Sequence, residues 1–113
     1  MVKRVHFYPD HDFPGEGVYS VFCPGCKCDH PFRVGKSRNL PNWSFNGDME
    51  KPTFSPSMLV NKDRPGGRCH SYVENGEIRF LSDCFHDLKG MTVELPEMDD
   101  DGDPVLNLQK GEG

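Results

Sequence analysis

The amino-acid sequence predicts a small, mainly β protein, an antiparallel sheet or sandwich with little helix. Ten prolines and twelve glycines make about a fifth of the 113 residues, and this composition favours turns and short strands over long helices. Short runs rich in β-branched and aromatic side chains stand between these turn residues. The clearest of them are two alternating runs that flank Asn75-Gly76, the dipeptide most typical of a tight β-hairpin.

Turn residues bound each expected strand. The expected strands are residues 2–8, 18–22, 32–34, 57–60, the two arms of a hairpin over 69–84, and 91–95. Pro52 and Pro56 confine the chain around them to a sheet edge or an irregular extended segment. Residues 86–89 are expected to make one helical turn, closed by Gly90. We expect a single domain over residues 1–96 and an acidic, disordered tail over 97–113.

The two-residue turn at Asn75-Gly76 predicts the pairing of the hairpin arms. It pairs Glu74 with Glu77 and, continued outward, Cys69 with Ser82. The more apolar face then carries Cys69, Ser71, Val73, Ile78, Phe80, Ser82 and Cys84. On that inward face Cys69 and Cys84 are diagonal neighbours, within about 7 Å of each other.

The net charge of −5 arises in the C-terminal segment. Residues 1–96 hold 12 basic and 12 acidic residues, whereas the excess of acidic residues follows Pro96. A neutral body offers no basic footprint for nucleic acid. The sequence contains no apolar run near the roughly 20 residues that span a bilayer and no signal-peptide core behind its N-terminal charges. We therefore expect a cytoplasmic protein that binds no membrane.

The segment Cys23-Pro-Gly-Cys26 has the spacing of a metal-binding knuckle. Pro24 and Gly25 permit a tight turn in which backbone N–H groups point at the sulfurs. The same spacing serves thiol redox chemistry, but redox versions usually begin a long helix, which residues 27–31 cannot form. Thiols stay reduced in the cytoplasm and five is an odd number of cysteines, so a metal site is favoured over disulfides.

The hairpin supplies the other half of the expected site. Cys69 and Cys84 would complete a tetrahedral zinc site with Cys23 and Cys26. Cys23, Cys26 and Cys84 are the firmest of these ligands. His86 is the rival of Cys69 for the fourth position, because a strand that continued past Cys84 would bring His86 to the same face.

Four protein ligands would make the zinc structural, whereas a catalytic zinc keeps one position open for water. In that second case His70, Asp83 or Glu77 would serve as the acid or base beside the water. His70 is also a lower-ranked ligand. Cys28 and His30 are expected to be spare groups or supports of the ligands.

The order of these segments resembles a family of small phage and prophage proteins of unknown function, over roughly residues 18–96. The matching motifs are Phe22-Cys-Pro-Gly-Cys26, Trp43-Ser-Phe-Asn-Gly-Asp48, Lys51-Pro-Thr-Phe-Ser-Pro-Ser57, Arg68-Cys-His-Ser71, Phe80-Leu-Ser-Asp-Cys84 with His86, and Gly90-Met-Thr-Val93. Members are often labelled "ammonia monooxygenase", a label that a thiol-rich ligand set without a membrane span argues against. The resemblance implies a phage origin, a bacterial host cytoplasm and a zinc-binding β fold. Related domains also occur beside bacterial ubiquitin-like conjugation genes.

Three functions follow from these observations. The first is a non-enzymatic phage accessory protein, a zinc-stabilised β domain that binds a host or phage protein. The second is a zinc-dependent hydrolase of peptide or isopeptide bonds, with His70 and Asp83 as its catalytic residues. The third is a nucleic-acid-binding zinc ribbon, against which the neutral body counts.

Overall fold

The computed structural model describes residues 2–61, 63 and 67–105, and its regular elements are short antiparallel strands. One sheet has the order β1-β2-β3, with β1 at His6–Pro9, β2 at Gly17–Cys23 and β3 at Cys28–Val34. A second has the order β6-β7-β8-β9, with β6 at Met58–Val60, β7 at Cys69–Glu74, β8 at Glu77–Phe80 and β9 at Thr92–Glu94. Two small ribbons pair β4 (Ser44–Phe45) with β5 (Phe54–Ser55) and β10 (Glu97–Met98) with β11 (Pro104–Val105).

The prediction of a mainly β fold is confirmed. Residues 86–89 form a hydrogen-bonded turn rather than a helix, with the Lys89 N–H donating to the His86 carbonyl. No helix in the described part of the chain is long and apolar enough to cross a membrane.

The hairpin of β7 and β8 has the predicted register. Ser71 pairs with Phe80 and Glu74 with Glu77, and Asn75 and Gly76 between the strands both have positive φ, at 53° and 82°. Glycine and asparagine are the residues that adopt this left-handed conformation most readily, and a type I′ turn requires it at both positions. The inward face is buried and the outward face, which carries His70, is not.

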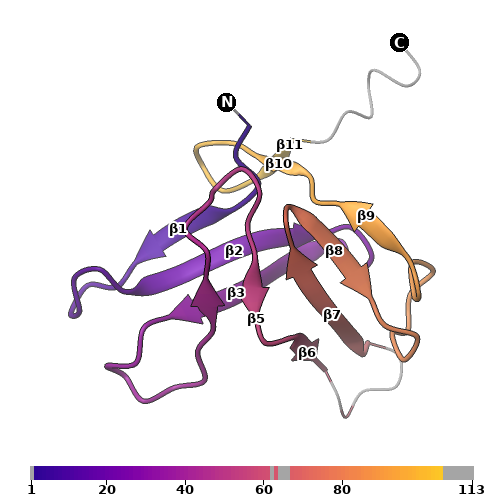
Figure 1. The fold of residues 1–113 in the computed structure, drawn as a ribbon, viewed down its shortest axis with the longest axis horizontal. Helices are drawn as coiled ribbons and strands as arrows, with labels where there is room; N and C mark the ends of the chain where they lie inside the picture. Colours follow the sequence, from indigo (N-terminus) through magenta and orange to yellow (C-terminus); the bar gives the residue numbers. More distant parts are fainter. Residues whose placement is uncertain (1, 62, 64–66, 106–113) are drawn as a thin grey trace.

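The hydrophobic core lies where the two larger sheets and the β4–β5 ribbon meet (Figure 1). Phe54 of the ribbon stacks on Phe32 of β3, with 4.2 Å between ring centroids, and on Phe45 at 4.8 Å. Ile78 and Phe80 contribute the apolar face of the hairpin to the same core. Aromatic rings thus join the two sheets, and the turn between β2 and β3 comes to rest against the β7–β8 hairpin.

Residues 97–105 differ from the expected disordered tail. β10 pairs with β11, Met98 is buried, and the Met98 N–H donates to the Lys3 carbonyl at 2.6 Å. The carboxylate of Asp99 accepts the backbone N–H of Asp101 and of Asp103, each at 2.9 Å, which stabilises the turn between the strands. One buried methionine and one self-capped turn therefore order a segment whose charge predicts disorder. Residues 106–113 lie outside the described residues.

Candidate functional site: a Cys-His metal group beside a Ser-His-Asp series

Cys23, Cys26, Cys69 and His86 form a cluster, called here the metal group. Its first half is the turn between β2 and β3. Cys23 ends β2 and pairs with Cys28 at the start of β3, so the four residues between them must reverse the chain. The Lys27 N–H donates to the Cys23 carbonyl at 2.7 Å, and the Cys26 N–H points at the Cys23 sulfur at 3.3 Å. This is the knuckle geometry that the C-x-x-C spacing predicts.

The second half comes from the hairpin and the turn that follows it. Cys69 begins β7 with its side chain on the buried face, and His86 lies in the turn after β8. The His86 Nε2 lies 3.4 Å from the Cys69 sulfur. The ring of His86 packs edge-on against Phe80, with 4.5 Å between ring centroids, and this contact holds the imidazole toward the knuckle.

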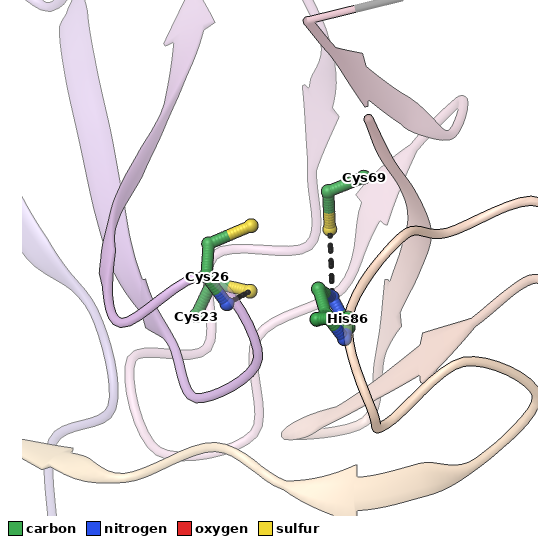
Figure 2. A group of neighbouring side chains, drawn as sticks. All are labelled: Cys23, Cys26, Cys69 and His86. Carbon is green, nitrogen blue, oxygen red and sulfur yellow. Dashed lines mark hydrogen bonds between the residues drawn. The ribbon is translucent and has the colours of Figure 1, made fainter. Parts of the chain in front are cut away.

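Four side chains therefore converge from segments far apart in the sequence (Figure 2). The three sulfurs of Cys23, Cys26 and Cys69 and one ring nitrogen of His86 all lie within 4.8 Å of one another. Ligand atoms about 2.0–2.3 Å from a tetrahedral ion are separated by slightly less than 4 Å, so a small contraction would close this group around one metal. All five cysteines are free thiols, which leaves the sulfurs available as ligands.

The electrostatics of the group favour a cation. The Cys69 thiol donates to the Cys23 sulfur and lowers the pKa of Cys23 to about 4, and the nearby His30 acts in the same direction. The pKa of Cys69 is raised because it supplies that hydrogen bond and because it is buried. Burial raises the pKa of Cys26 to about 12, and the negative charge of Cys23 adds to this. Without a cation the group readily holds one thiolate, but a second thiolate would be repelled by the first and would be poorly solvated. A bound metal cation would offset this repulsion.

The imidazole of His86 imposes one condition on metal binding. The Leu88 N–H approaches its Nδ1 at 3.2 Å, an arrangement that leaves the ring proton on Nε2. A metal bound at Nε2 requires that proton to move to Nδ1, and the contact with Leu88 would then give way.

The group differs from the expected ligand set at one position, since His86 stands where Cys84 was expected. Strand β8 ends at Phe80, and the chain turns before it reaches Cys84. The Cys84 sulfur instead lies 3.1 Å from both the backbone nitrogen and the carbonyl oxygen of His70. Cys84 thereby fastens the turn after β8 to β7.

Two further sulfur or nitrogen groups lie near this site. Cys28 is exposed and lies outside the four-atom group, which agrees with a spare thiol. His30 is 3% exposed, its Nε2 has no hydrogen-bond partner among the described residues, and it lies close enough to Cys23 to influence its pKa. His30 is thus positioned to support a ligand rather than to act as one.

Gly25 offers a direct test of the role of His86. A Cβ at this position would lie 2.2–2.5 Å from three ring atoms of His86, so Gly25→Ala must displace the imidazole without altering any ligand atom. We expect the affinity for metal to fall by at least about 10-fold, measured by competition with a chromogenic chelator. Gly47→Ala is the control: its Cβ would meet nothing within 4 Å, and its φ of +84° makes it the more strained substitution. Equal metal affinity in the two variants would contradict a ligand role for His86.

A second series of polar side chains lies on the outward face of the same hairpin. The Ser57 Oγ lies 3.1 Å from the Nε2 of His70, and the Nδ1 of His70 lies 3.3 Å from Oδ2 of Asp83. Ser57 immediately precedes β6, His70 is on β7 opposite Leu59, and Asp83 follows β8. The His70 side chain is 25% exposed and that of Asp83 is 42% exposed, so the series is open to solvent on one side.

This series has the arrangement of a nucleophile, a general base and a carboxylate that orients the base. The Ser57–His70 separation is within the range at which an imidazole can take a hydroxyl proton, and the slightly longer His70–Asp83 contact is usual in a protein without substrate. Such triads occur on unrelated folds and are recognised by their geometry rather than by their order in the chain. The arrangement can therefore perform acyl transfer from an amide or ester to Ser57.

Sequence reasoning selected His70 and Asp83 but missed Ser57. It placed both residues beside a zinc-bound water, whereas in the structure His70 contacts Asp83 through Nδ1 and Ser57 through Nε2. Ser57 lies within the motif Lys51-Pro-Thr-Phe-Ser-Pro-Ser57, yet no glycine-flanked serine elbow or similar signal marks it as a nucleophile. The only available signal was its position at the start of a strand that could pair with the strand of His70.

Comparison with known families agrees with this geometry. The family model described as "Bacterial ubiquitination-like system serine protease (BubE)" matches residues 2–81 of the chain. The chain belongs to the BubE family. Ser57 and His70 lie inside the matched segment, and Asp83 follows two residues after its end. Searches of curated proteins and of solved structures found no match.

The BubE match corrects the first functional interpretation. A non-enzymatic accessory protein was expected, and this is wrong because the family is one of serine proteases. The hydrolase interpretation agrees better with the match. The phage origin and the cytoplasmic location stay predictions from the sequence.

Proposed function

We propose that this protein is a serine protease with Ser57 as nucleophile, His70 as general base and Asp83 as the group that orients His70. The observation that carries the proposal is the contact of Ser57 with His70, and of His70 with Asp83, in a member of a serine-protease family. The metal group supports this choice over a zinc hydrolase, because its four protein donors leave no position for a reacting water.

The mechanism follows from the contacts. The Ser57 Oγ attacks the carbonyl carbon of the scissile bond while His70 Nε2 accepts the hydroxyl proton, and the Nδ1–H of the resulting imidazolium donates to Asp83. His70 then gives its proton to the leaving amine, and the acyl group remains on Ser57. A water molecule, deprotonated by His70, releases the acyl group and restores the serine hydroxyl.

The substrate class follows from the description of the family. A ubiquitination-like system joins a protein to its target through an amide or related acyl bond, and a serine nucleophile can open any such bond. We infer that the scissile bond is a peptide or isopeptide bond in a bacterial conjugation system of this type.

We further propose that the metal is zinc and that its role is structural. A group of three cysteines and one histidine is a typical structural zinc ligand set. Cys69 directly precedes His70, and Asp83 is separated from His86 by two residues. A zinc ion bound by Cys69 and His86 would therefore hold together the two segments that carry the base and its orienting carboxylate, while taking no part in the reaction itself.

A fluorophosphonate tests the proposal, because it reacts with an activated serine hydroxyl far faster than with an ordinary one. Labelling is expected at Ser57 alone, identified by mass spectrometry of a digest. Asp83→Asn is expected to slow the labelling by about 10²–10⁴-fold, because an amide stabilises neither the required tautomer of His70 nor the imidazolium.

Asp87→Asn is the matched control for Asp83→Asn. Asp87 is an exposed aspartate in the next turn of the chain and makes no described contact with His70, so the labelling rate of this variant should equal that of the native protein. Labelling of another serine, or equal rates in Asp83→Asn and Asp87→Asn, would contradict the proposed triad.

A further inference from the structure

Strand β6, which follows Ser57 directly, is an edge strand. The sheet has the order β6-β7-β8-β9. Strand β6 pairs with β7 on one side, and no described strand pairs with β6 on its other side. In Figure 1, β6 lies beside β7, on the side of β7 away from β8. Unpaired N–H and C=O groups on a sheet edge can bind another extended chain.

The hydrogen bonds of β7 establish which groups of β6 face outward. In an antiparallel strand the N–H and C=O of one residue point to the same side, and the side alternates along the strand. The His70 carbonyl accepts the Leu81 N–H at 2.9 Å, and the Cys84 sulfur lies 3.1 Å from both polar backbone atoms of His70. Both groups of His70 therefore point away from β6.

Leu59 must then present its own backbone to the open edge. It lies opposite His70, and since His70 directs neither group toward β6, the two form a non-hydrogen-bonded pair. The neighbouring pairs, Met58 with Ser71 and Val60 with Cys69, are the ones that hold β6 to β7. The N–H and C=O of Leu59 consequently point off the sheet, within about 7 Å along the strand of the Ser57 backbone.

Two other features define this edge. Leu59 is 42% exposed, so an apolar side chain is accessible to solvent close to the nucleophile. On the other side, the indole Nε1–H of Trp43 donates to the Ser57 carbonyl at 3.2 Å. Trp43 thus occupies the Ser57 carbonyl, and within the described part of the chain the first backbone N–H and C=O without a partner on this edge are those of Leu59.

We propose that the edge of β6 binds the substrate as an added strand, in which the backbone of an extended segment next to the scissile bond pairs with Leu59. The inference rests on the proposed function, since it places the substrate by reference to Ser57. It names the substrate class as an unfolded, extended stretch of polypeptide, with an apolar side chain against Leu59 about two residues from the bond that is cleaved. A folded surface loop or a small ester could not pair with this edge as a strand and would gain no binding energy from it.

Leu59→Pro tests the pairing because it removes the outward N–H and leaves the bonds to β7 intact. Proline is tolerated on an edge strand, and the residue before it is already extended. The probes are a tetra-alanyl phosphonate, which has a peptide backbone, and an alkyl fluorophosphonate, which has none. We expect Leu59→Pro to slow the reaction with the tetra-alanyl probe by at least about 10-fold and to leave the alkyl probe unaffected.

Leu59→Ala is the matched control, since it keeps the N–H and loses only the apolar contact. Its reaction with the tetra-alanyl probe should slow by less than that of Leu59→Pro. If Leu59→Pro does not fold, as judged by circular dichroism, the pairing is tested on the native protein instead. The probes are then tetra-alanyl phosphonates that are N-methylated at each amide in turn. One of the methylated probes should react about 10-fold or more slowly, because the methyl group removes an N–H that pairs with β6 or prevents the close approach of the two strands.

The outcomes separate this inference from the function on which it rests. If the alkyl probe labels Ser57 but neither Leu59→Pro nor any N-methyl group slows the tetra-alanyl probe, the edge does not bind substrate and the protease assignment stands. If neither probe labels Ser57, the protease assignment and the substrate edge both fail.

Discussion

Replacing Ser57 by alanine is expected to abolish hydrolysis, with a loss in kcat of about 10⁴-fold or more. Its Oγ is the nucleophile in the proposed mechanism, and the substitution removes that single atom from a half-buried site whose neighbours, Met58 and His70, are held by strand pairing. The fold should be unchanged, so the thermal midpoint is expected to shift by no more than a few degrees. The measurement is the rate of cleavage of a peptide or conjugated substrate, with circular dichroism alongside.

Ser55→Ala is the control for Ser57→Ala. Ser55 is exposed on β5, two residues before the nucleophile, and its hydroxyl makes no described hydrogen bond. This variant should retain full activity. Residual activity of Ser57→Ala near that of Ser55→Ala would mean that another group performs the chemistry, and the His70–Asp83 pair would then need a different partner.

Removing the metal is expected to have the second large effect, on stability and on activity together. A protein purified without chelator should carry one zinc ion per chain, measured by elemental analysis. Cys69→Ser, or treatment with a strong chelator, is expected to lower the free energy of unfolding by more than about 4 kcal/mol. That is a large part of the roughly 5–15 kcal/mol that stabilises a typical domain.

The loss of activity follows from the places of the ligands in the chain. Cys69 is next to His70, and Asp83 is separated from His86 by two residues, so release of the ion would let the base and its carboxylate separate. Fluorophosphonate labelling should fall in parallel with metal content and recover when zinc is restored.

Cys28→Ser is the matched control for Cys69→Ser. It also replaces a free thiol at the start of a strand, but Cys28 is exposed and lies outside the four-atom group. It should keep its zinc, its stability and its activity. A zinc-free native protein with unchanged stability and labelling would overturn the structural role of the metal.

The sequence by itself determined the fold class and the hairpin that carries half of each site. Asn75-Gly76 requires positive φ at two adjacent positions and so sets the turn, and the period of two then places Cys69 inward and His70 outward. These are local properties, in which each residue constrains its near neighbours. The C-x-x-C knuckle is local in the same way, since Cys23 and Cys26 are brought together by their own turn.

Only the tertiary structure decided which distant groups meet these local units. His86 joins the cysteines because β8 ends at Phe80 and the following turn is fastened to β7 through Cys84, which no periodicity predicts. Ser57 reaches His70 because β6 pairs with β7, and that pairing depends on packing between segments rather than on either segment alone. A serine also carries no charge or ligand signature in a sequence. The β class and the cysteine knuckle are thus readable in the sequence, whereas the contact of Ser57 with His70 appears only in the folded chain.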